Sequence, residues 1–565
     1  MVFGFLTSLV PFAHTIMPFL VLLSFVSLVF LIVYNSRFLK SFFTKLDWKI
    51  WLLLIIILAA NLAFLLSLPH YNKMWTDESM IILTAKNLLN LDPVGPYYKP
   101  IGWSFLLSII FFFFGLNYNV AIDASCVFGA LSATMVFFIA YIMTGKKYLS
   151  LLSSVIFSLF ASHIFWATSA ESNVTSMFFA LLAVFFCLLY YKEKKTSLFW
   201  LSCSALLFAC LFRIEMAIFI ILFFVGGIMF IPGFIKRLKE RKYAICIIIC
   251  TVFIIINFIG SQPYWAGSKE NAMMAKSSIW QGASGYIDYV SMKSLLSNLS
   301  GPSISFWIVA AFSLAGLIYC FIHHRKWAYF LTAWLILTNI FIASIALVNI
   351  ACCGIERFYT LFLPVIAILP IYAIIFISSL MKKNNILSAS STIALALLLL
   401  ASTFLHMSYY VQLSNLSCDE FLLSESKLPI WPSEDFPPDG LLFLESKLPL
   451  WLSKDFAPDC AVITILPEIV SSSSDFKVYR TSEFLSNGLL RERLFNSTGC
   501  IVFVQEMICD EGNPFKIKAE CERMHKEYNL ELNQTYAHYK TEDDDILFAA
   551  YIIRKKAASR NIELQ

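Results

Sequence analysis

The sequence predicts an all-α polytopic membrane domain of about twelve spans, followed by a small soluble α/β domain. Three observations support this fold class. The 565-residue chain is 59% hydrophobic and 14% charged, with a mean hydropathy of +0.74, whereas an average soluble domain carries roughly 25% charged residues. Apolar runs of spanning length recur between residues 15 and 405, and the composition changes near residue 410. A soluble enzyme, a coiled coil and a disordered scaffold are therefore excluded.

A membrane-spanning helix needs about 20 apolar residues. The candidate runs are roughly 15–34, 51–68, 120–143, 149–167, 174–191, 197–212, 214–231, 243–260, 303–322, 328–349, 358–379 and 386–405. The first run has neither a basic segment before it nor a clear small-residue cleavage site, so we interpret it as a retained span.

The basic residues predict the side of the membrane that each loop occupies. Basic clusters occur at 37–49, 146–147, 192–195, 236–242, 325–326 and 382–383. All of them are cytoplasmic under the positive-inside rule only if the apolar stretch 101–116 does not cross the membrane. We therefore expect 101–116 to be a helix that lies in the outer interface or dips partway into the bilayer. The five Asn-x-Ser/Thr sequons all fall on the predicted outer side, at Asn173, Asn298, Asn415, Asn496 and Asn533.

The distribution of charge divides the chain into a part that suits a membrane and a part that suits water. Residues 1–410 carry 26 basic and 12 acidic side chains, and the remaining residues carry 16 and 25. We predict a membrane-embedded domain at 1–410, with a first outer loop at 69–118 that contains interfacial helices. A linker at 411–459 follows, with the tandem repeat ESKLPIWPSEDFPPD and ESKLPLWLSKDFAPD. An extracytoplasmic α/β domain is expected at 460–565.

The tail alternates strand and helix patterns, which is typical of a small α/β layer domain. Strands are predicted at 460–466, 476–480, 500–507 and 546–553, and helices at 482–495 and 514–527. Five cysteines lie in this tail, so one or two disulfides are plausible there, but their pairing cannot be derived from the spacing. The seven cysteines inside apolar runs are interpreted as small core residues.

Nine of the twelve acids in the membrane part fall on the predicted outer face. Asp77 and Glu78 directly follow a span and open an amphipathic helix. They either cap that helix, where acids are favourable, or act as a general base beside apolar surface. Lys99 precedes the interfacial helix, where it either snorkels to the interface or binds a phosphate at headgroup level.

Three further outer positions carry charge. Glu171 lies in the loop between two spans and is either an exposed acid or a second catalytic carboxylate. Arg213 and Glu215 lie at a break between two apolar segments, where charge is costly. They either pair with each other at a short turn, or Arg213 holds an anion. Arg357 opens another span as an interfacial anchor or a bidentate phosphate ligand.

The spacing of the histidines and of the basic residues bears on metal and nucleic-acid sites. His70 and His163 lie on or near the outer face without a close His/Glu pair, so no metal ligands are assigned. No basic run is interleaved with stacking aromatics, so no nucleic-acid partner is predicted.

Four segments carry a family resemblance. They read TDESMIILTAKNLL, YYKPIGWSFLLSIIFFFFGLN, ATSAESNVTSMFFALLAVFF and GIERFYTLFLPVIAILP. Together they resemble the polytopic GT-C glycosyltransferases over roughly residues 45–405. The group they are most similar to comprises dolichyl-phosphate-mannose–protein mannosyltransferases (family 39) and the aminoarabinose transferase that acts on lipid A.

The resemblance implies a function in protein glycosylation or in the cell envelope. It implies a polyprenyl- or dolichyl-phosphate-linked monosaccharide as donor, a protein, glycan or lipid acceptor, and inversion by single displacement on the extracytoplasmic face. Asp77 would be the base, Glu78 its support, and Glu171 would lie near the sugar. Lys99, and with it Arg213 and Arg357, would bind the lipid phosphate. Relatives have an acid where this chain has Tyr98, which leaves the use of a divalent metal open.

Two other functions remain as alternatives. A transporter or lipid flippase would place ionisable residues near the centres of spans and would show repeated spans. Here the charges gather at one membrane surface, which favours the enzyme. A membrane scaffold that presents the tail would not need the outer acids and bases to converge on one cavity.

Overall fold

The computed structural model describes residues 10–68, 75–91, 100–267, 302–351, 358, 360–381, 385–415, 456, 460–464, 477–486, 488–497, 500–506, 518–536 and 548–554. The chain forms two compact units, and each is treated by itself. The first unit contains residues 1–71 and 84–415, and the second contains residues 72–83 and 416–565.

The first unit is a bundle of helices, and each predicted span coincides with a helix or with a broken helix. These helices are α2 (Val10–Tyr34), α4 (Trp48–Ser67), α7 (Tyr118–Thr144), α8 (Lys147–Ser158) with α9 (Ala161–Ala167), α10 (Asn173–Glu193), α11 (Thr196–Phe212), η1 (Ile214–Ala217) with α12 (Ile218–Phe230), α14 (Arg241–Gly267), α17 (Pro302–His323), α18 (Arg325–Ala351), α19 (Leu363–Leu380) and α20 (Asn385–Asn415). Short helices α3 (Ser36–Phe43) and α13 (Phe234–Leu238) lie between them.

Length and hydropathy set a stricter test for membrane spans. Within the described residues, five helices are long and apolar enough to cross a bilayer. A sixth span results if α8 and α9, which are bent by 65° at their break, count as one. These helices support an integral membrane protein, while the number of twelve spans stays a prediction.

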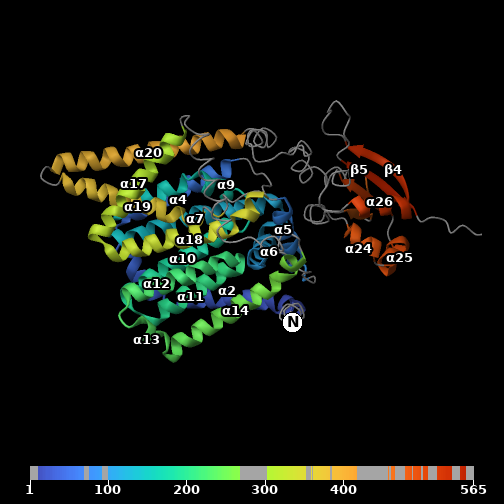
Figure 1. Cartoon of the computed structure of the whole chain (residues 1–565), viewed down its shortest axis with the longest axis horizontal. Helices are drawn as coiled ribbons and strands as arrows, with labels where there is room; N and C mark the ends of the chain where they lie inside the picture. Colours follow the sequence, from blue (N-terminus) through green and yellow to red (C-terminus); the bar gives the residue numbers. More distant parts are fainter. Residues whose placement is uncertain are drawn as a thin grey trace, which may run out of the picture. The chain divides into compact units, whose positions relative to one another are not determined.

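The buried fraction of the helices decreases from the centre of the bundle to its surface. Helix α10 packs on α11, on α7 and on α12, which in turn contacts α18 (Figure 1). The apolar window of α10 is 89% buried, whereas those of α2 and α4 are only 22% buried. Apolar side chains that face outward on a peripheral helix suit hydrocarbon rather than water.

The predicted interfacial segment forms helix α6 (Gly102–Phe114). Its first turns are buried at Trp103 and Leu107, whereas Phe112, Phe113 and Phe114 are each more than 70% exposed. A Cβ added at Gly102 would lie 2.5 Å from the backbone oxygen of Leu211. Glycine is therefore needed for α6 to approach the end of α11 this closely.

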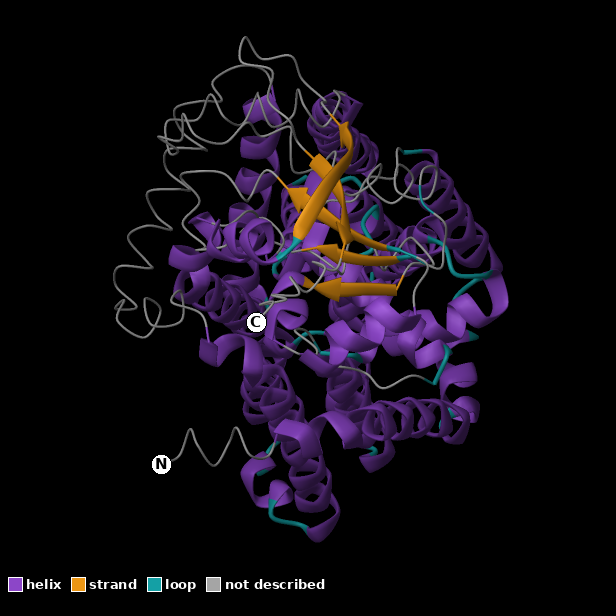
Figure 2. Ribbon diagram, turned by 90° about the vertical axis from the view of Figure 1, so that its right-hand side faces the viewer, coloured by secondary structure: helices purple, strands orange, loops and turns teal. Residues whose placement is uncertain are grey.

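The second unit contains an α/β domain with a five-stranded sheet in the order β2-β1-β3-β5-β4. Figure 2 shows its strands in orange. Its strands are β1 (Ala461–Thr464), β2 (Lys477–Arg480), β3 (Ile501–Glu506), β4 (Asn529–Tyr536) and β5 (Phe548–Arg554), and its helices are α24 (Thr481–Ser486), α25 (Gly488–Ser497) and α26 (Lys518–Glu527). β2, β1 and β3 are parallel, and β5 pairs antiparallel with both β3 and β4. Four strands and the helical regions were predicted, and β4 was not.

A disulfide links the starts of the neighbouring parallel strands β1 and β3. Cys460 and Cys500, which directly precede β1 and β3, are bonded with their Cα atoms 4.5 Å apart. The Ala461 N–H also donates to the Cys500 carbonyl at 2.9 Å. The aromatic core beneath contains Phe484 and Phe503, both fully buried.

Candidate active site

The loop between α9 and α10 is buried along its whole length, although sequence alone left an exposed loop as one interpretation of it. Residues 168–173 are each at most 2% exposed, and the Glu171 side chain is fully buried. The loop bonds to itself: the Ser169 hydroxyl donates to the Trp166 carbonyl at 3.0 Å, and the Ser172 N–H donates to Glu171 Oε2 at 3.2 Å. A buried carboxylate requires a compensating partner.

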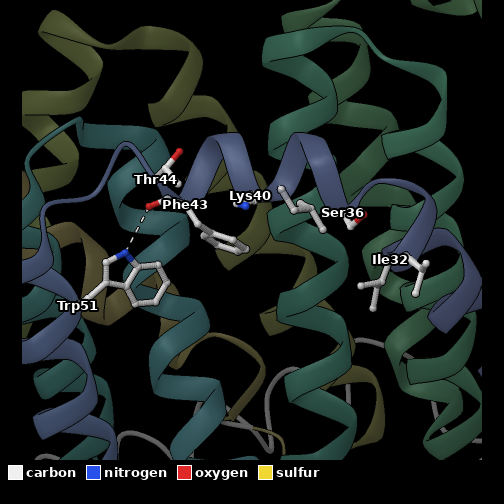
Figure 3. Close-up of a pocket in the computed structure, with 8 residues that line it drawn as sticks. Ile32, Ser36, Lys40, Phe43, Thr44 and Trp51 are labelled. Atoms are coloured by element: carbon white, nitrogen blue, oxygen red, sulfur yellow. Dashed lines mark hydrogen bonds between the residues drawn. The ribbon is translucent and has the colours of Figure 1, made fainter.

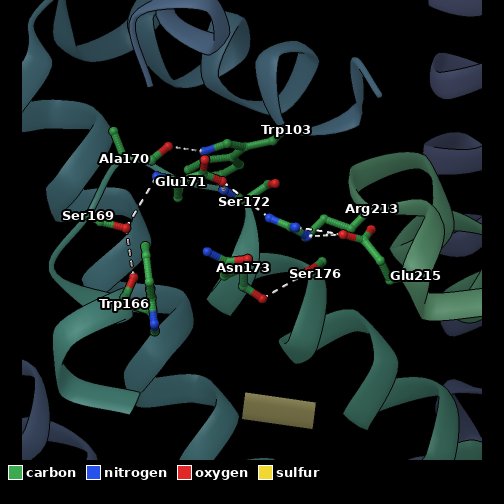
Figure 4. A network of polar contacts seen from close by, with 10 residues as sticks. All are labelled: Trp103, Trp166, Ser169, Ala170, Glu171, Ser172, Asn173, Ser176, Arg213 and Glu215. Atoms are coloured by element: carbon green, nitrogen blue, oxygen red, sulfur yellow. Dashed lines mark hydrogen bonds and ion pairs between the residues drawn. The ribbon is translucent and has the colours of Figure 1, made fainter. Parts of the chain in front are cut away.

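Arg213 supplies that partner from the turn between α11 and η1 (Figure 4). Its Nη1 donates to Glu171 Oε2 at 3.3 Å. Its Nη2 and Nε donate to Glu215 Oε1 at 2.6 and 3.2 Å. The Arg213 side chain is 7% exposed and that of Glu215 is 18% exposed. One planar guanidinium therefore joins two carboxylates from two loops.

Two aromatic side chains bring further segments to this ion-pair cluster. The Trp103 indole N–H of α6 donates to the Ala170 carbonyl at 2.7 Å, next to Glu171. The ring of Phe358, which precedes α19, lies 5.6 Å from the Arg213 guanidinium carbon. This distance allows a cation–π interaction. The α6 start, the α9–α10 loop, the α11–η1 turn and the segment before α19 thus meet at one place.

Sequence reasoning missed the contribution of Trp103. The indole is fully buried, so its N–H needs an acceptor. The available signal was a tryptophan directly after Gly102, since a glycine permits close backbone approach and a buried indole N–H usually finds an acceptor.

The remaining candidates are only partly described. Glu78 lies in α5 (Trp75–Leu89) and is fully buried, but residues 72–83 belong to the second unit. The side chain of Asp77 and all of Lys99 and Arg357 lie outside the described residues. Convergence of Asp77, Glu78 and Lys99 with Glu171 therefore stays a prediction.

The described part of the chain gathers no carboxylate and histidine set with metal-ligand spacing. Its one group of three metal-ligating side chains consists of cysteines, remote in sequence from Glu171. His163 is 1% exposed, and its ring lies 4.3 Å from that of Phe157. The sequon residue Asn173 is 2% exposed, which excludes glycan attachment in this conformation.

A surface pocket of about 560 Å³ lies between α2, α3 and α4 (Figure 3). It is lined by residues 32–51, among them Lys40, Phe43 and Trp51, and the Trp51 indole donates to the Phe43 carbonyl at 3.3 Å. None of the candidate site residues contributes to this pocket.

The long apolar helices of the first unit define an integral membrane protein of mostly helical structure, as the sequence predicted. Two solved structures share this fold: ArnT from Cupriavidus metallidurans in the apo state, with a TM-score of 0.55, and the same protein bound to undecaprenyl phosphate, with a TM-score of 0.56. Each is 11% identical in sequence, and the match covers 89% of this chain and 97% of ArnT. No protein-family model matches the sequence, and no curated protein matches it.

Proposed function

We propose that the protein is an integral-membrane glycosyltransferase that moves a monosaccharide from a polyprenyl-phosphate donor to an acceptor hydroxyl. The observation that carries this proposal is the fold match over 89% of the chain to an ArnT structure that contains undecaprenyl phosphate. A donor that arrives within the bilayer explains why the chemistry-bearing side chains gather at helix ends rather than in a soluble nucleotide-binding domain.

The proposed reaction is a single inverting displacement on the extracytoplasmic face. Asp77 acts as the base that takes the proton of the acceptor hydroxyl, with Glu78 as its support. Glu171 contacts the sugar, and Lys99 and Arg357 hold the phosphate leaving group, whose developing charge they stabilise. The sugar leaves phosphate oxygen as the acceptor oxygen bonds to the anomeric carbon, so bonds and charges balance.

Arg213 has two proposed roles that make different demands. As a phosphate ligand, it must reach the donor while two carboxylates compete for it. As a positioning residue, it keeps the buried Glu171 ionised and oriented. Its contacts with Glu171 and Glu215 support the second role in the state described, and binding of the phosphate would require Arg213 to loosen at least one of them.

The α/β domain at 460–565 is proposed to bind the acceptor or an outer-surface partner, with 411–459 as a linker. Polyprenyl chains of dolichyl and undecaprenyl type and hexosyl or pentosyl headgroups are all consistent with this proposal. The donor panel of the test therefore has to span mannose, glucose and arabinose forms.

The test is transfer of radiolabelled sugar from a panel of polyprenyl-phosphate sugars into membrane acceptors. Asp77→Asn is compared with wild type at matched expression, and Asp47→Asn is the control. Asp47 pairs with Lys147 at 2.9 Å among the predicted cytoplasmic residues, far in sequence from the outer loops. Loss of a general base costs typically about 10²–10⁴-fold in rate, so Asp77→Asn should abolish detectable transfer while Asp47→Asn retains it.

Other results would redirect the assignment. Equal transfer by wild type and Asp77→Asn would remove Asp77 from the catalytic role. No transfer by folded wild type with any donor of the panel would favour a transporter or lipid flippase instead.

A further inference from the structure

Three thiols meet between α11 and α14. The sulfur atoms of Cys203, Cys246 and Cys250 all lie within 4.8 Å of one another. Cys203 comes from α11, and the other two are one helical turn apart on α14, so they face the same neighbour. Packing as small apolar side chains explains the burial of Cys246, but two of the three thiols are only half-buried. Core packing alone therefore does not explain why the three sulfur atoms lie together.

The spacing matches what three sulfur ligands around one metal ion need. Metal–thiolate bonds to a d¹⁰ ion are about 2.3 Å long, which places the sulfurs about 4 Å apart. Thiolates are soft ligands that select Cu(I) or Zn(II) over hard cations. Small rotations about the side-chain bonds suffice to bring sulfurs within 4.8 Å to this spacing.

The number and kind of ligands favour Cu(I). The group offers three sulfur atoms, whereas Zn(II) in structural sites almost always takes four ligands in a tetrahedron. A carboxylate or imidazole is absent from the described group, which again favours an ion that accepts sulfur alone.

The site also has an approach from the basic end of the helices. Cys246 is five residues from the start of α14 at Arg241, which corresponds to about 7.5 Å along the axis. Nearer that end, the Thr196 and Tyr243 hydroxyls lie 3.3 Å apart between the same two helices. These two hydroxyls can coordinate an ion on its way to the sulfur atoms.

We propose that Cys203, Cys246 and Cys250 form a three-sulfur binding site for Cu(I). The bound ion ties α11 to α14 and so stabilises the helix whose end carries Arg213. The site is independent of the proposed sugar transfer, and its test does not use that activity.

The test measures Cu(I) binding by the full-length purified protein. The starting background replaces five cysteines that lie neither in the helical unit's described helices nor in the disulfide with serine, at 352, 353, 418, 509 and 521. Reduced protein without oxygen competes for Cu(I) with the chromogenic chelator bathocuproine disulfonate, and X-ray absorption reports the atoms bound to copper. Cys246→Ser and Cys250→Ser are compared with Cys210→Ser, a fully buried thiol of α11 outside the group, and with Cys320→Ser of α17.

We expect about one Cu(I) per chain, bound by three sulfurs at about 2.3 Å, in the background protein and in both controls. Cys246→Ser and Cys250→Ser should each weaken binding more than about 100-fold, since changes to outer-shell partners alone cost about 10–100-fold. Copper should also raise the thermal midpoint of the background protein and not that of Cys246→Ser.

Several results would overturn the proposal. They are the absence of bound Cu(I) in the folded background protein, copper bound by nitrogen or oxygen, equal losses in the control variants, and a disulfide among the three cysteines in freshly isolated protein. The absorption spectrum of the background protein decides the question even if a serine variant fails to fold.

Discussion

The ion pair of Arg213 with Glu171 makes a quantitative prediction about stability. Glu171 is fully buried, and its carboxylate lies 3.3 Å from the guanidinium. At an effective dielectric constant of about 20, Coulomb's law gives roughly 5 kcal/mol of attraction at this distance. Removal of one partner from a buried pair typically costs about 3–5 kcal/mol, because the other charge is left without compensation. We therefore expect Arg213→Met to destabilise the helical unit by about 3–5 kcal/mol.

A double-mutant cycle separates this charge effect from lost packing. Glu171→Gln keeps an oxygen that can accept from the Ser172 N–H and removes the charge. Arg213→Met combined with Glu171→Gln should therefore cost less than the sum of the single variants, by about 2–3 kcal/mol. The exposed Lys147–Asp47 pair is the matched control, and Lys147→Met should cost less than about 1 kcal/mol.

The assay is thermal unfolding of detergent-purified protein, followed with a dye that becomes fluorescent on reaction with buried thiols. Seven free cysteines of the described helices report on this unit. For about 400 residues, an unfolding entropy near 2.1 cal/mol/K per residue converts 3–5 kcal/mol into a midpoint shift of about 4–6 °C. A shift for Arg213→Met no larger than that for Lys147→Met, or strict additivity in the double variant, would refute the reasoning.

Three further predictions concern other parts of the chain. Gly102→Ala should lower the thermal midpoint of the helical unit, because the new Cβ would lie 2.5 Å from the Leu211 carbonyl oxygen; a midpoint equal to wild type would contradict this contact. Replacement of both Cys460 and Cys500 by alanine should destabilise the α/β domain by about 3–4 kcal/mol, since their disulfide closes a loop of 40 residues; unchanged resistance to protease would contradict it. Burial lowers the pKa of His525 below 6.5, so the unfolded chain binds the proton first and the domain should lose stability as the pH falls below about 6.5; His525→Gln should remove that slope in urea unfolding.

Local sequence predicted the helices well, because their signal lies within each segment. Every predicted span falls on a helix, since about 20 consecutive apolar residues allow little else in a membrane. The pairing of Arg213 with Glu215 was also accessible, because the two are separated by one residue at a break between helices.

Other features depend on contacts that sequence does not encode locally. Strand β4 was missed because its sequence, NLELNQTY, contains two asparagines and a glutamate, which are depleted in strands. Its two leucines alternate correctly, but an edge strand with one solvated face gives a weak pattern. The burial of Glu171 was equally hidden, since Arg213 lies 42 residues away and Trp103 contacts the loop across 67 residues.

The charge of the ion-pair cluster limits how it can serve a phosphate-bearing donor. Glu171, Arg213 and Glu215 together carry a formal charge of −1, so these three side chains alone do not attract a phosphate. Glu215 has the shorter contact but is 18% exposed, so water can solvate it when that contact opens, whereas the fully buried Glu171 lacks this solvation. If a phosphate reaches Arg213, Glu215 is therefore the partner that it displaces, and the bond to Glu171 persists. The contacts therefore favour the positioning role of Arg213 toward Glu171, and under the proposed function we expect Lys99 and Arg357 to supply the attraction for phosphate.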